Sequence, residues 1–239
     1  MDKNMLIEAG KRKGLTNKEH IEKDYFQDMF LHDIFKKTGK LVFKGGTALY
    51  KIYNLPRFSE DLDFTMLEDF NTEKLIGKVI GDRGEIKSSR KTKESLLIKI
   101  GLNGILTSYN TLRIDVSIKN DVLSGFDVRS YVPEFVDINP FSLKVMKPHE
   151  MLAEKIHSIM AREKARDLYD LFFLLRMTRF DRHLVDKKLN LFGMKLSPRV
   201  LKKRTENLES LWESELKSFV MQELPDFRTV RDFVMGKLI

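Results

Sequence analysis

The chain has 239 residues and a formal net charge of +8 at pH 7, with 43 Lys or Arg against 35 Asp or Glu. It contains no cysteine, which excludes disulfides and thiolate–metal sites, and its 42% hydrophobic content is typical of a folded globular protein. Met1 is followed by charged residues, and no stretch is apolar enough for a signal peptide or a membrane span, so we expect a cytoplasmic protein.

The first half of the chain alternates helix and strand patterns. Thr16 and Glu19 have the spacing of a capping box, and apolar residues then recur at helical intervals. The expected elements are a helix over 17–37, a buried strand over 41–43, a short helix over 47–53, a strand over 61–66 and a helix over 72–81.

Two alternating runs follow, which predict a hairpin of strands over 96–102 and 111–119 with its turn at 108–110. After residue 145 the composition becomes helical. Helices are expected over 148–160, 165–177 and 197–219, with a last one starting at Pro225. We therefore predict an α+β protein with a mixed sheet in residues 1–145 and a helical domain in residues 146–239, which is expected to pack against the sheet and wall a cleft.

Asp61 and Asp63 are the first candidate site residues. Side chains alternate along a strand, so the two carboxylates share one face while Leu62 points to the other. Adjacent carboxylates raise each other's pKa unless a cation lies between them, and hard oxygen ligands with open positions suit Mg²⁺. The alternative is a solvated strand end, where aspartates are common.

The turn Gly45-Gly46-Thr47 precedes this pair. Glycines let backbone N–H groups approach a phosphate without a side chain in the way, and threonine adds a hydroxyl. A phosphate-binding turn joined by a short helix to a carboxylate pair indicates phosphoryl or nucleotidyl transfer.

Asp115 interrupts an otherwise alternating strand, where a charge must stay hydrated or paired. It either pairs with Arg113 on an exposed face, or it joins the first two aspartates as a third carboxylate on a neighbouring strand.

Four motifs occur in order, and together they resemble one family. They are Gly45-Gly46-Thr47-Ala48-Leu49, Arg57-Phe58-Ser59-Glu60-Asp61-Leu62-Asp63, Ala153-Glu154-Lys155-Ile156 and Arg166-Asp167-Leu168-Tyr169-Asp170-Leu171. The glycine turn with Asp-x-Asp resembles the polymerase-β-like nucleotidyltransferases. The full set of four motifs resembles the AbiEii/AbiGii toxin family within that superfamily.

The resemblance implies a metal-dependent nucleotidyltransferase that moves a nucleoside monophosphate from an NTP to an acceptor. Asp61, Asp63 and Asp115 would hold two Mg²⁺ ions, for which Mn²⁺ can substitute. RNA is the expected acceptor, with the tRNA 3′ end as a candidate, and the basic charge agrees with this. The enzyme would act as the toxin of a toxin–antitoxin or abortive-infection system and would have a cognate antitoxin as a protein partner.

The resemblance also assigns roles outside the carboxylate set. Lys155 would place a point charge on a nucleotide phosphate, although a lysine beside an apolar stripe can also reach solvent. Arg57 and Ser59 would bind the outer phosphates together with Gly45, Gly46 and Thr47. One of Asp167 and Asp170 would be catalytic, and the sequence leaves open which; both can also pair with Arg166 and Lys164.

Two other functions remain open at this stage. The same metal site could transfer a phosphoryl group to a protein such as the antitoxin. The chain could also be an inactive module that binds nucleotide or RNA, although its intact carboxylates argue against this.

Overall fold

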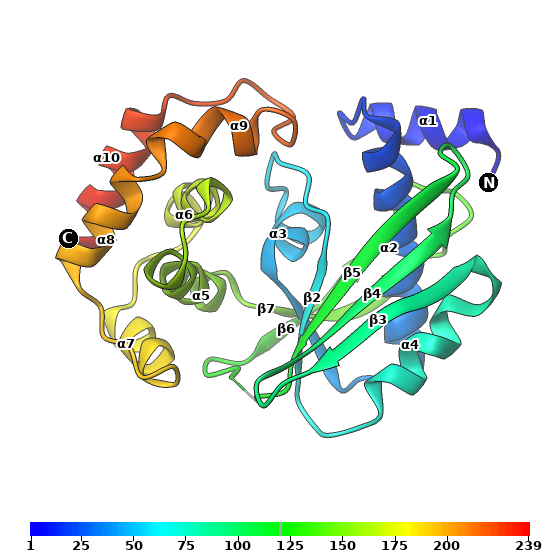
Figure 1. Ribbon diagram of the computed structural model, residues 1–239, viewed down its shortest axis with the longest axis horizontal. Coiled ribbons are helices and arrows are strands. Elements are labelled where there is room, and N and C mark those ends of the chain that lie inside the picture. Colours follow the sequence, from blue (N-terminus) through cyan, green and yellow to red (C-terminus); the bar gives the residue numbers. More distant parts are fainter. Residues whose placement is uncertain (120) are drawn as a thin grey trace. The chain divides into compact units, whose positions relative to one another are not determined.

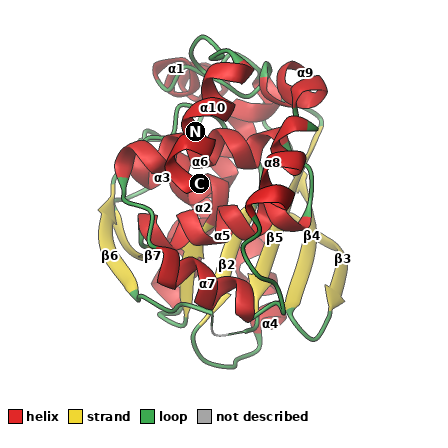
Figure 2. Ribbon diagram, turned by 90° about the vertical axis from the view of Figure 1, so that its left-hand side faces the viewer, coloured by secondary structure: helices red, strands yellow, loops and turns green. Residues whose placement is uncertain are grey.

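The computed structural model describes residues 1–119 and 121–239. In these residues seven strands form one mixed sheet with the order β3-β4-β5-β2-β1-β7-β6, and Figure 2 shows β6 and β3 at its two edges. The strands are β1 Leu41–Lys44, β2 Leu62–Met66, β3 Gly84–Lys91, β4 Ser95–Asn103, β5 Tyr109–Ser117, β6 Phe126–Tyr131 and β7 Phe141–Met146. Strand β2 runs parallel to β5 and antiparallel to β1, so the predicted α+β class with a mixed sheet is confirmed.

Helices precede, interrupt and follow the strands (Figure 1). They are α1 Lys3–Arg12, α2 Lys18–Lys37, α3 Gly45–Tyr53, α4 Thr72–Ile80, α5 Pro148–Ala161, α6 Ala165–Met177, α7 Arg182–Asn190, α8 Pro198–Glu206, α9 Trp212–Leu216 and α10 Phe227–Leu238, with short 3-10 turns η1 Gly81–Arg83 and η2 Glu209–Leu211. No helix within the described residues has both the length and the apolar character needed to cross a membrane.

The chain divides into two compact units. The first contains the sheet and helices α1–α4, and the second contains α5–α10. The second unit also includes two short segments from the first half of the sequence, Asn54–Arg57 and Asp121–Gly125. Arg57 is therefore part of the helical unit although it lies only four residues before Asp61 in the chain.

Aromatic side chains fill the core of the first unit, where Phe30, Phe43, Phe58, Phe64 and Phe135 are at most 1% exposed. Phe43 and Phe64 face each other in the β1–β2 register and pack with ring centroids 5.6 Å apart. Each such ring removes a large apolar area from water, which is the main term that stabilises a sheet against its helices.

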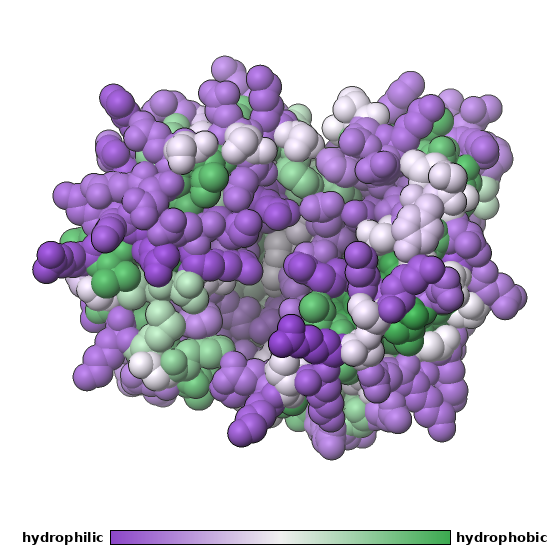
Figure 3. All heavy atoms as spheres, viewed as in Figure 1, coloured by the Kyte–Doolittle hydropathy of each residue, from purple (hydrophilic) through white to green (hydrophobic). Residues whose placement is uncertain are grey.

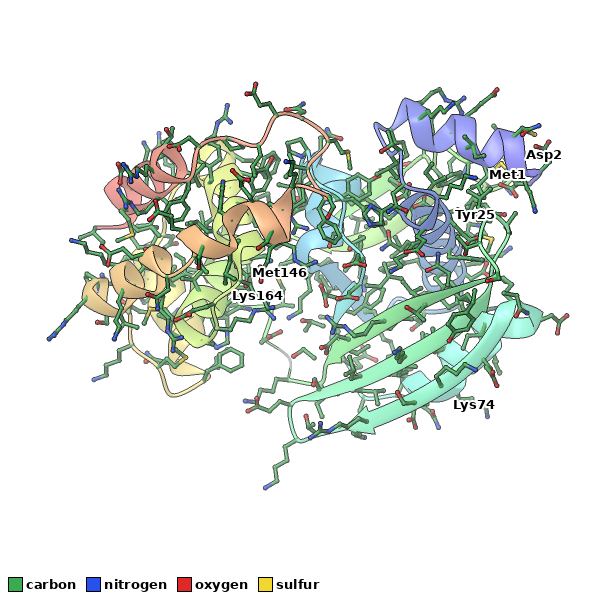
Figure 4. All side chains as sticks on the ribbon, turned by 45° about the horizontal axis from the view of Figure 1, so that its top comes forward. Met1, Asp2, Tyr25, Lys74, Met146 and Lys164 are labelled. Atoms are coloured by element: carbon green, nitrogen blue, oxygen red, sulfur yellow. The ribbon has the colours of Figure 1, made fainter. Side chains whose placement is uncertain are left out.

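The N-terminal segment is fixed to the first unit through Asp137. Its carboxylate accepts a hydrogen bond of 2.7 Å from the hydroxyl of Tyr25 and lies 3.2 Å from the N-terminal ammonium group of Met1. Met1 and Tyr25 accordingly lie near each other in Figure 4. Helix α1, which has no counterpart among the sequence predictions, starts two residues after this contact.

Local details differ from the sequence predictions in both units. Helix α2 is capped by Asn17, whose side chain accepts hydrogen bonds from Glu19 and His20, so the capping box from Thr16 is wrong. The predicted helix over 197–219 is broken into α8, η2 and α9, after the hydroxyl of Thr205 turns to the carbonyls of Leu201 and Lys202.

The hairpin β4–β5 is confirmed, but its turn was misplaced. Tyr109 and Asn110 already belong to β5, and Tyr109 pairs with Asn103. The connecting loop lies earlier, because three backbone N–H groups of residues 105–107 donate to the carboxylate of Glu22 on α2. Strands β3 and β6 were missed because they lie at the sheet edges and are mostly exposed, so they lack apolar alternation.

Candidate functional site

Strand β1 passes directly into helix α3 at Gly45, which has a positive φ of 75°. A Cβ atom on Gly45 would lie 2.2 Å from Oδ2 of Asp63, so the carboxylate occupies the space that glycine leaves. Both the backbone conformation and this close approach require glycine. The predicted glycine turn is thus the first turn of α3, packed against a site carboxylate.

Asp63 and Asp115 lie beside each other on neighbouring strands. The parallel register of β2 and β5 pairs Asp63 with Asp115, and on its other side Asp63 pairs with Lys44 of β1. Paired residues of adjacent strands share a face about 4.8 Å apart. Ile114 and Val116 are fully buried on the other face of β5, so Asp115 points away from the core.

Asp61 immediately precedes β2 and uses its side chain differently. Its carboxylate forms an ion pair with Arg113, which lies two residues before Asp115 on β5. Its backbone carbonyl accepts a hydrogen bond from the hydroxyl of Thr47, which is fully buried in α3. In this structure the Thr47 hydroxyl therefore holds the segment before β2, where the sequence had suggested a phosphate contact.

The segment before Asp61 is held at several points within the first unit. The carbonyl of Ser59 accepts a hydrogen bond of 2.8 Å from the side chain of Gln27, and Glu60 pairs with Lys23 at 3.1 Å. The ring of Phe58 stacks on His20 with centroids 4.6 Å apart. Helix α2 thus fixes the approach to the Asp-x-Asp motif through three consecutive residues.

The carboxylates do not form a complete metal site in this conformation. Within residues 1–119 and 121–239, no group of three or more His, Asp or Glu side chains is arranged to hold a metal ion. Asp63 and Asp115 are adjacent, and Asp61 is turned to Arg113. The chemistry of the set nevertheless suits a hard divalent cation, since all three donors are carboxylate oxygens.

A second charged cluster is buried in the helical unit. Arg57 binds Asp170 through Nε and Nη2, both at 2.9 Å. Lys155 lies 2.7 Å from Asp170 and 2.9 Å from Asp167. Arg162 completes the cluster at 2.9 Å from Asp167. One network of alternating charges thus joins residues that three of the four sequence motifs contribute.

The cluster changes two expectations drawn from the sequence. Lys164, one of the cations suggested as a partner for the aspartates, pairs with Glu215 at 3.4 Å. Lys155 and Arg57 are both buried, so the alternative in which Lys155 reaches solvent is wrong.

The electrostatics of this cluster follow from its burial. Burial alone raises the pKa of the Asp167 carboxyl, but the charges of Lys155 and Arg162 outweigh it and lower that pKa to about 2. Burial alone lowers the pKa of Lys155, but Asp167 and Asp170 outweigh it, so the pKa of this ammonium is raised. Lys155 and Asp167 are therefore both ionised near neutral pH.

Comparison with known proteins identifies the family to which this chain belongs. The family of nucleotidyl transferase AbiEii toxins of type IV toxin–antitoxin systems matches residues 30–233, which include both charged clusters. The chain belongs to the AbiEii toxin family. The resemblance read from the four motifs is thus confirmed, and the chain is a nucleotidyltransferase toxin by family.

Solved structures share the fold of this chain. MenT4, a nucleotidyltransferase toxin from Mycobacterium tuberculosis, superimposes with a TM-score of 0.69 at 19% identity, over 97% of this chain and 87% of that one. JHP933 from Helicobacter pylori gives a TM-score of 0.58 at 20% identity, over 93% of this chain and 90% of that one. Among curated proteins none matches the sequence.

A third charged group of this AbiEii family member was missed by sequence reasoning. Lys51 on α3 lies 2.6 Å from both Asp24 and Asp28 on α2, and all three side chains are fully buried. Tyr131 also donates to Asp28, at 3.0 Å. The only signal was two aspartates four residues apart on a helix otherwise predicted to be amphipathic, and nothing in the sequence placed Lys51 beside them.

Replacing Gly45 by Ala is expected to destabilise the protein by about 2–4 kcal/mol, from a left-handed backbone strain and an overpacked contact with Asp63. Transfer activity should fall as well, because Asp63 must move. Urea unfolding and a transfer assay measure the two effects.

Gly77→Ala on α4 is the matched control, since nothing lies within 4 Å of the added Cβ. It should stabilise by up to about 1 kcal/mol. Equal behaviour of the two variants would contradict the packing of Asp63 on Gly45.

The low pKa of Asp167 predicts an acid-dependent loss of stability. A carboxyl whose pKa is lowered on folding stabilises above its unfolded value near 4, and that stabilisation is lost as pH falls toward about 2. The stability difference between wild type and Asp167→Asn should therefore shrink by about 1 kcal/mol between pH 5 and pH 3. Urea unfolding at both pH values measures it. The exposed Asp186→Asn serves as control and should show no such change; a constant difference for Asp167→Asn would refute the prediction.

Proposed function

We propose that this AbiEii toxin transfers a nucleoside monophosphate from an NTP to a hydroxyl group of an RNA acceptor, with Mg²⁺ as its cofactor. The observation that carries the proposal is the register of β2 and β5, which pairs Asp63 with Asp115 on one sheet face beside the N-terminus of α3. The tRNA 3′ end remains a candidate acceptor.

The carboxylates would hold the cation. Asp63 and Asp115 are positioned for this by the sheet, and Asp61 would join them by exchanging its partner Arg113 for the cation. A bound divalent cation would neutralise the negative charge that develops on the phosphates during transfer. Two ions are expected from the family resemblance, and Mn²⁺ can replace Mg²⁺.

The first turn of α3 would bind the triphosphate. Backbone N–H groups at a helix N-terminus have no partner inside the helix, and the helix dipole favours an anion there. Gly45 and Gly46 add no side chain that would keep a phosphate away. Thr47 and Ser59 would contribute mainly by fixing the segment before Asp61, since the Thr47 hydroxyl and the Ser59 carbonyl are both engaged in holding it.

The reaction would proceed by displacement at the α-phosphorus. The acceptor hydroxyl oxygen forms the new bond and loses its proton, and the bond to the bridging oxygen breaks so that pyrophosphate leaves. The family resemblance assigns Lys155 and Arg57 to nucleotide binding, and we propose that within the helical unit Asp167 and Asp170 orient these two cations. The contacts among these four residues support the orienting part of this proposal.

The test uses the purified protein with Mg²⁺, total RNA and NTPs labelled at either the α- or the γ-phosphate. Nucleotidyl transfer should leave α-label on RNA and release γ-label as pyrophosphate. Label from the γ-position on a protein would instead establish phosphoryl transfer. If neither label is transferred while RNA is bound, the chain is an inactive binding module. Omission of Mg²⁺ with added chelator tests the metal requirement.

A further inference from the structure

One face of strands β3, β4 and β5 is open. Alternate residues of β5 are fully buried, and helices α2 and α4 pack on that side; α2 lies behind β4 and β5 in Figure 1. The intervening residues of β5, which include Asp115, point to the opposite side and are partly or largely exposed. We call this opposite side of β3–β5 the open face.

Cations lie across the open face beside the carboxylates. The β4–β5 register pairs Lys99 with Arg113 and Leu97 with Asp115, and the β3–β4 register pairs Arg90 with Leu97. Arg90 and Asp115 are therefore two strands apart, and a strand spacing of about 4.8 Å puts their Cα atoms about 10 Å apart. Lys99, on the strand between them, lies nearer to Asp115. The cations therefore begin next to the site carboxylates and extend to the sheet edge.

Two of these cations differ from Arg113, which pairs with Asp61 as described above. Neither Lys99 nor Arg90 forms an ion pair with any other described residue, and both are exposed. Their charge is therefore available to an external anion.

An aromatic side chain extends the open face along β5. Tyr109 is 49% exposed and lies over Gly101 of β4, whose added Cβ would be 2.6 Å from the tyrosine hydroxyl. Lys87 of β3 shares this position, since its Nζ is 5.8 Å from the Tyr109 ring centroid. An exposed aromatic ring beside a lysine on a sheet is a platform on which a nucleic acid base can stack.

From these observations we propose that the open face binds the single-stranded end of the acceptor RNA, with phosphates at Lys99 and Arg90 and a base on Tyr109. This deepens the proposed function and rests on it for the identity of the acceptor. The strand would run toward Asp115, so that its terminal hydroxyl reaches the carboxylates.

A protein partner is the competing occupant and fits the open face less well. Protein interfaces have an apolar core and few charges at their centre. None of the large exposed hydrophobic side chains within the described residues belongs to the open-face positions of β4 or β5 except Tyr109. In Figure 3 the visible surface is mainly hydrophilic, with hydrophobic atoms in small separate patches.

The test measures binding of a fluorescent single-stranded RNA of about 12 nucleotides by anisotropy, without NTP, across a range of salt concentrations. The double variant Lys99→Glu/Arg90→Glu should bind about tenfold more weakly at low salt. Its salt dependence should be reduced by about one unit of slope for each phosphate that the protein no longer neutralises. Tyr109→Ala should weaken binding about tenfold with little change in slope.

The matched control is Lys74→Glu/Lys78→Glu on α4, which carries the same charge change on the covered side of the sheet (Lys74 is labelled in Figure 4). It should bind within about threefold of wild type. Circular dichroism and ATP binding should be unchanged in the Lys99→Glu/Arg90→Glu variant, since neither residue lies in the proposed nucleotide site.

The proposal is overturned if wild type does not bind this RNA at low salt, or if both double variants lose the same affinity. It is also overturned if the Lys99→Glu/Arg90→Glu variant binds this RNA with the affinity of wild type. These binding measurements do not depend on catalysis. If the open face binds RNA as proposed but no nucleoside monophosphate is transferred, only the proposed reaction is rejected.

Discussion

Asp115→Asn is expected to abolish transfer as fully as Asp63→Asn, with a fall in kcat of at least about 10³-fold. The two carboxylates are paired in the β2–β5 register, so both face the same position. Residues that act as one unit lose activity non-additively, and the double variant should therefore be no worse than either single one. Transfer of α-labelled nucleotide, and growth of cells that express the chain, measure the loss.

Stability should move in the opposite direction from activity. Like charges paired across adjacent strands destabilise a sheet, so neutralising either aspartate should leave thermal stability unchanged or slightly raised. Asp127→Asn on edge strand β6 is the control, because Asp127 is a strand aspartate paired locally with Arg129. It should change neither activity nor toxicity. A folded Asp115→Asn protein that still transfers nucleotide would remove Asp115 from the site.

Asp170→Ala is expected to lower the free energy of unfolding by about 3–5 kcal/mol. Asp170 is fully buried and forms ion pairs with both Arg57 and Lys155, so its loss leaves two buried cations short of a partner. For a chain of this size the midpoint of thermal unfolding should fall by about 10 °C or more. Denaturant and thermal unfolding measure both quantities.

Two comparisons make this prediction specific. Lys155→Met should lower the free energy of unfolding by less than Asp170→Ala does. In that variant Asp170 still has Arg57 as an ion-pair partner, and Asp167 still has Arg162. Asp186→Ala, which breaks an exposed pair with Arg182, should change stability by less than about 0.5 kcal/mol. If Asp170→Ala behaved like Asp186→Ala, the buried cluster would contribute nothing to stability.

Stability measurements also distinguish a structural role from a catalytic role for the two aspartates of this motif. The sequence left open whether Asp167 or Asp170 is functional, and the structure shows both bound to Lys155 in one cluster. A variant that loses transfer but keeps wild-type stability would identify a residue needed for chemistry rather than folding. Asp167→Asn is expected to be less destabilising than Asp170→Ala, since Arg162, its second partner, is 58% exposed and can be solvated after the change.

The sequence by itself determined the family and the α+β class, and it predicted the position of the candidate site carboxylates along the chain. These follow from local signals: Gly45-Gly46 before a short helix, Asp-x-Asp at the start of a strand, and alternation around Asp115. Side-chain alternation is a property of the strand alone, so Asp115 could be placed on the polar face without knowing its neighbours.

Only the tertiary structure decided which residues meet. The β2–β5 register, the packing of Asp63 on Gly45 and the ion pair of Asp61 with Arg113 each join segments that are remote in sequence. The same holds for the buried contacts of Lys155 and Lys51. A charged residue has the same local pattern whether it reaches solvent or is buried beside an opposite charge. The difference is set by partners that folding brings together, because burial costs free energy unless such a partner is present.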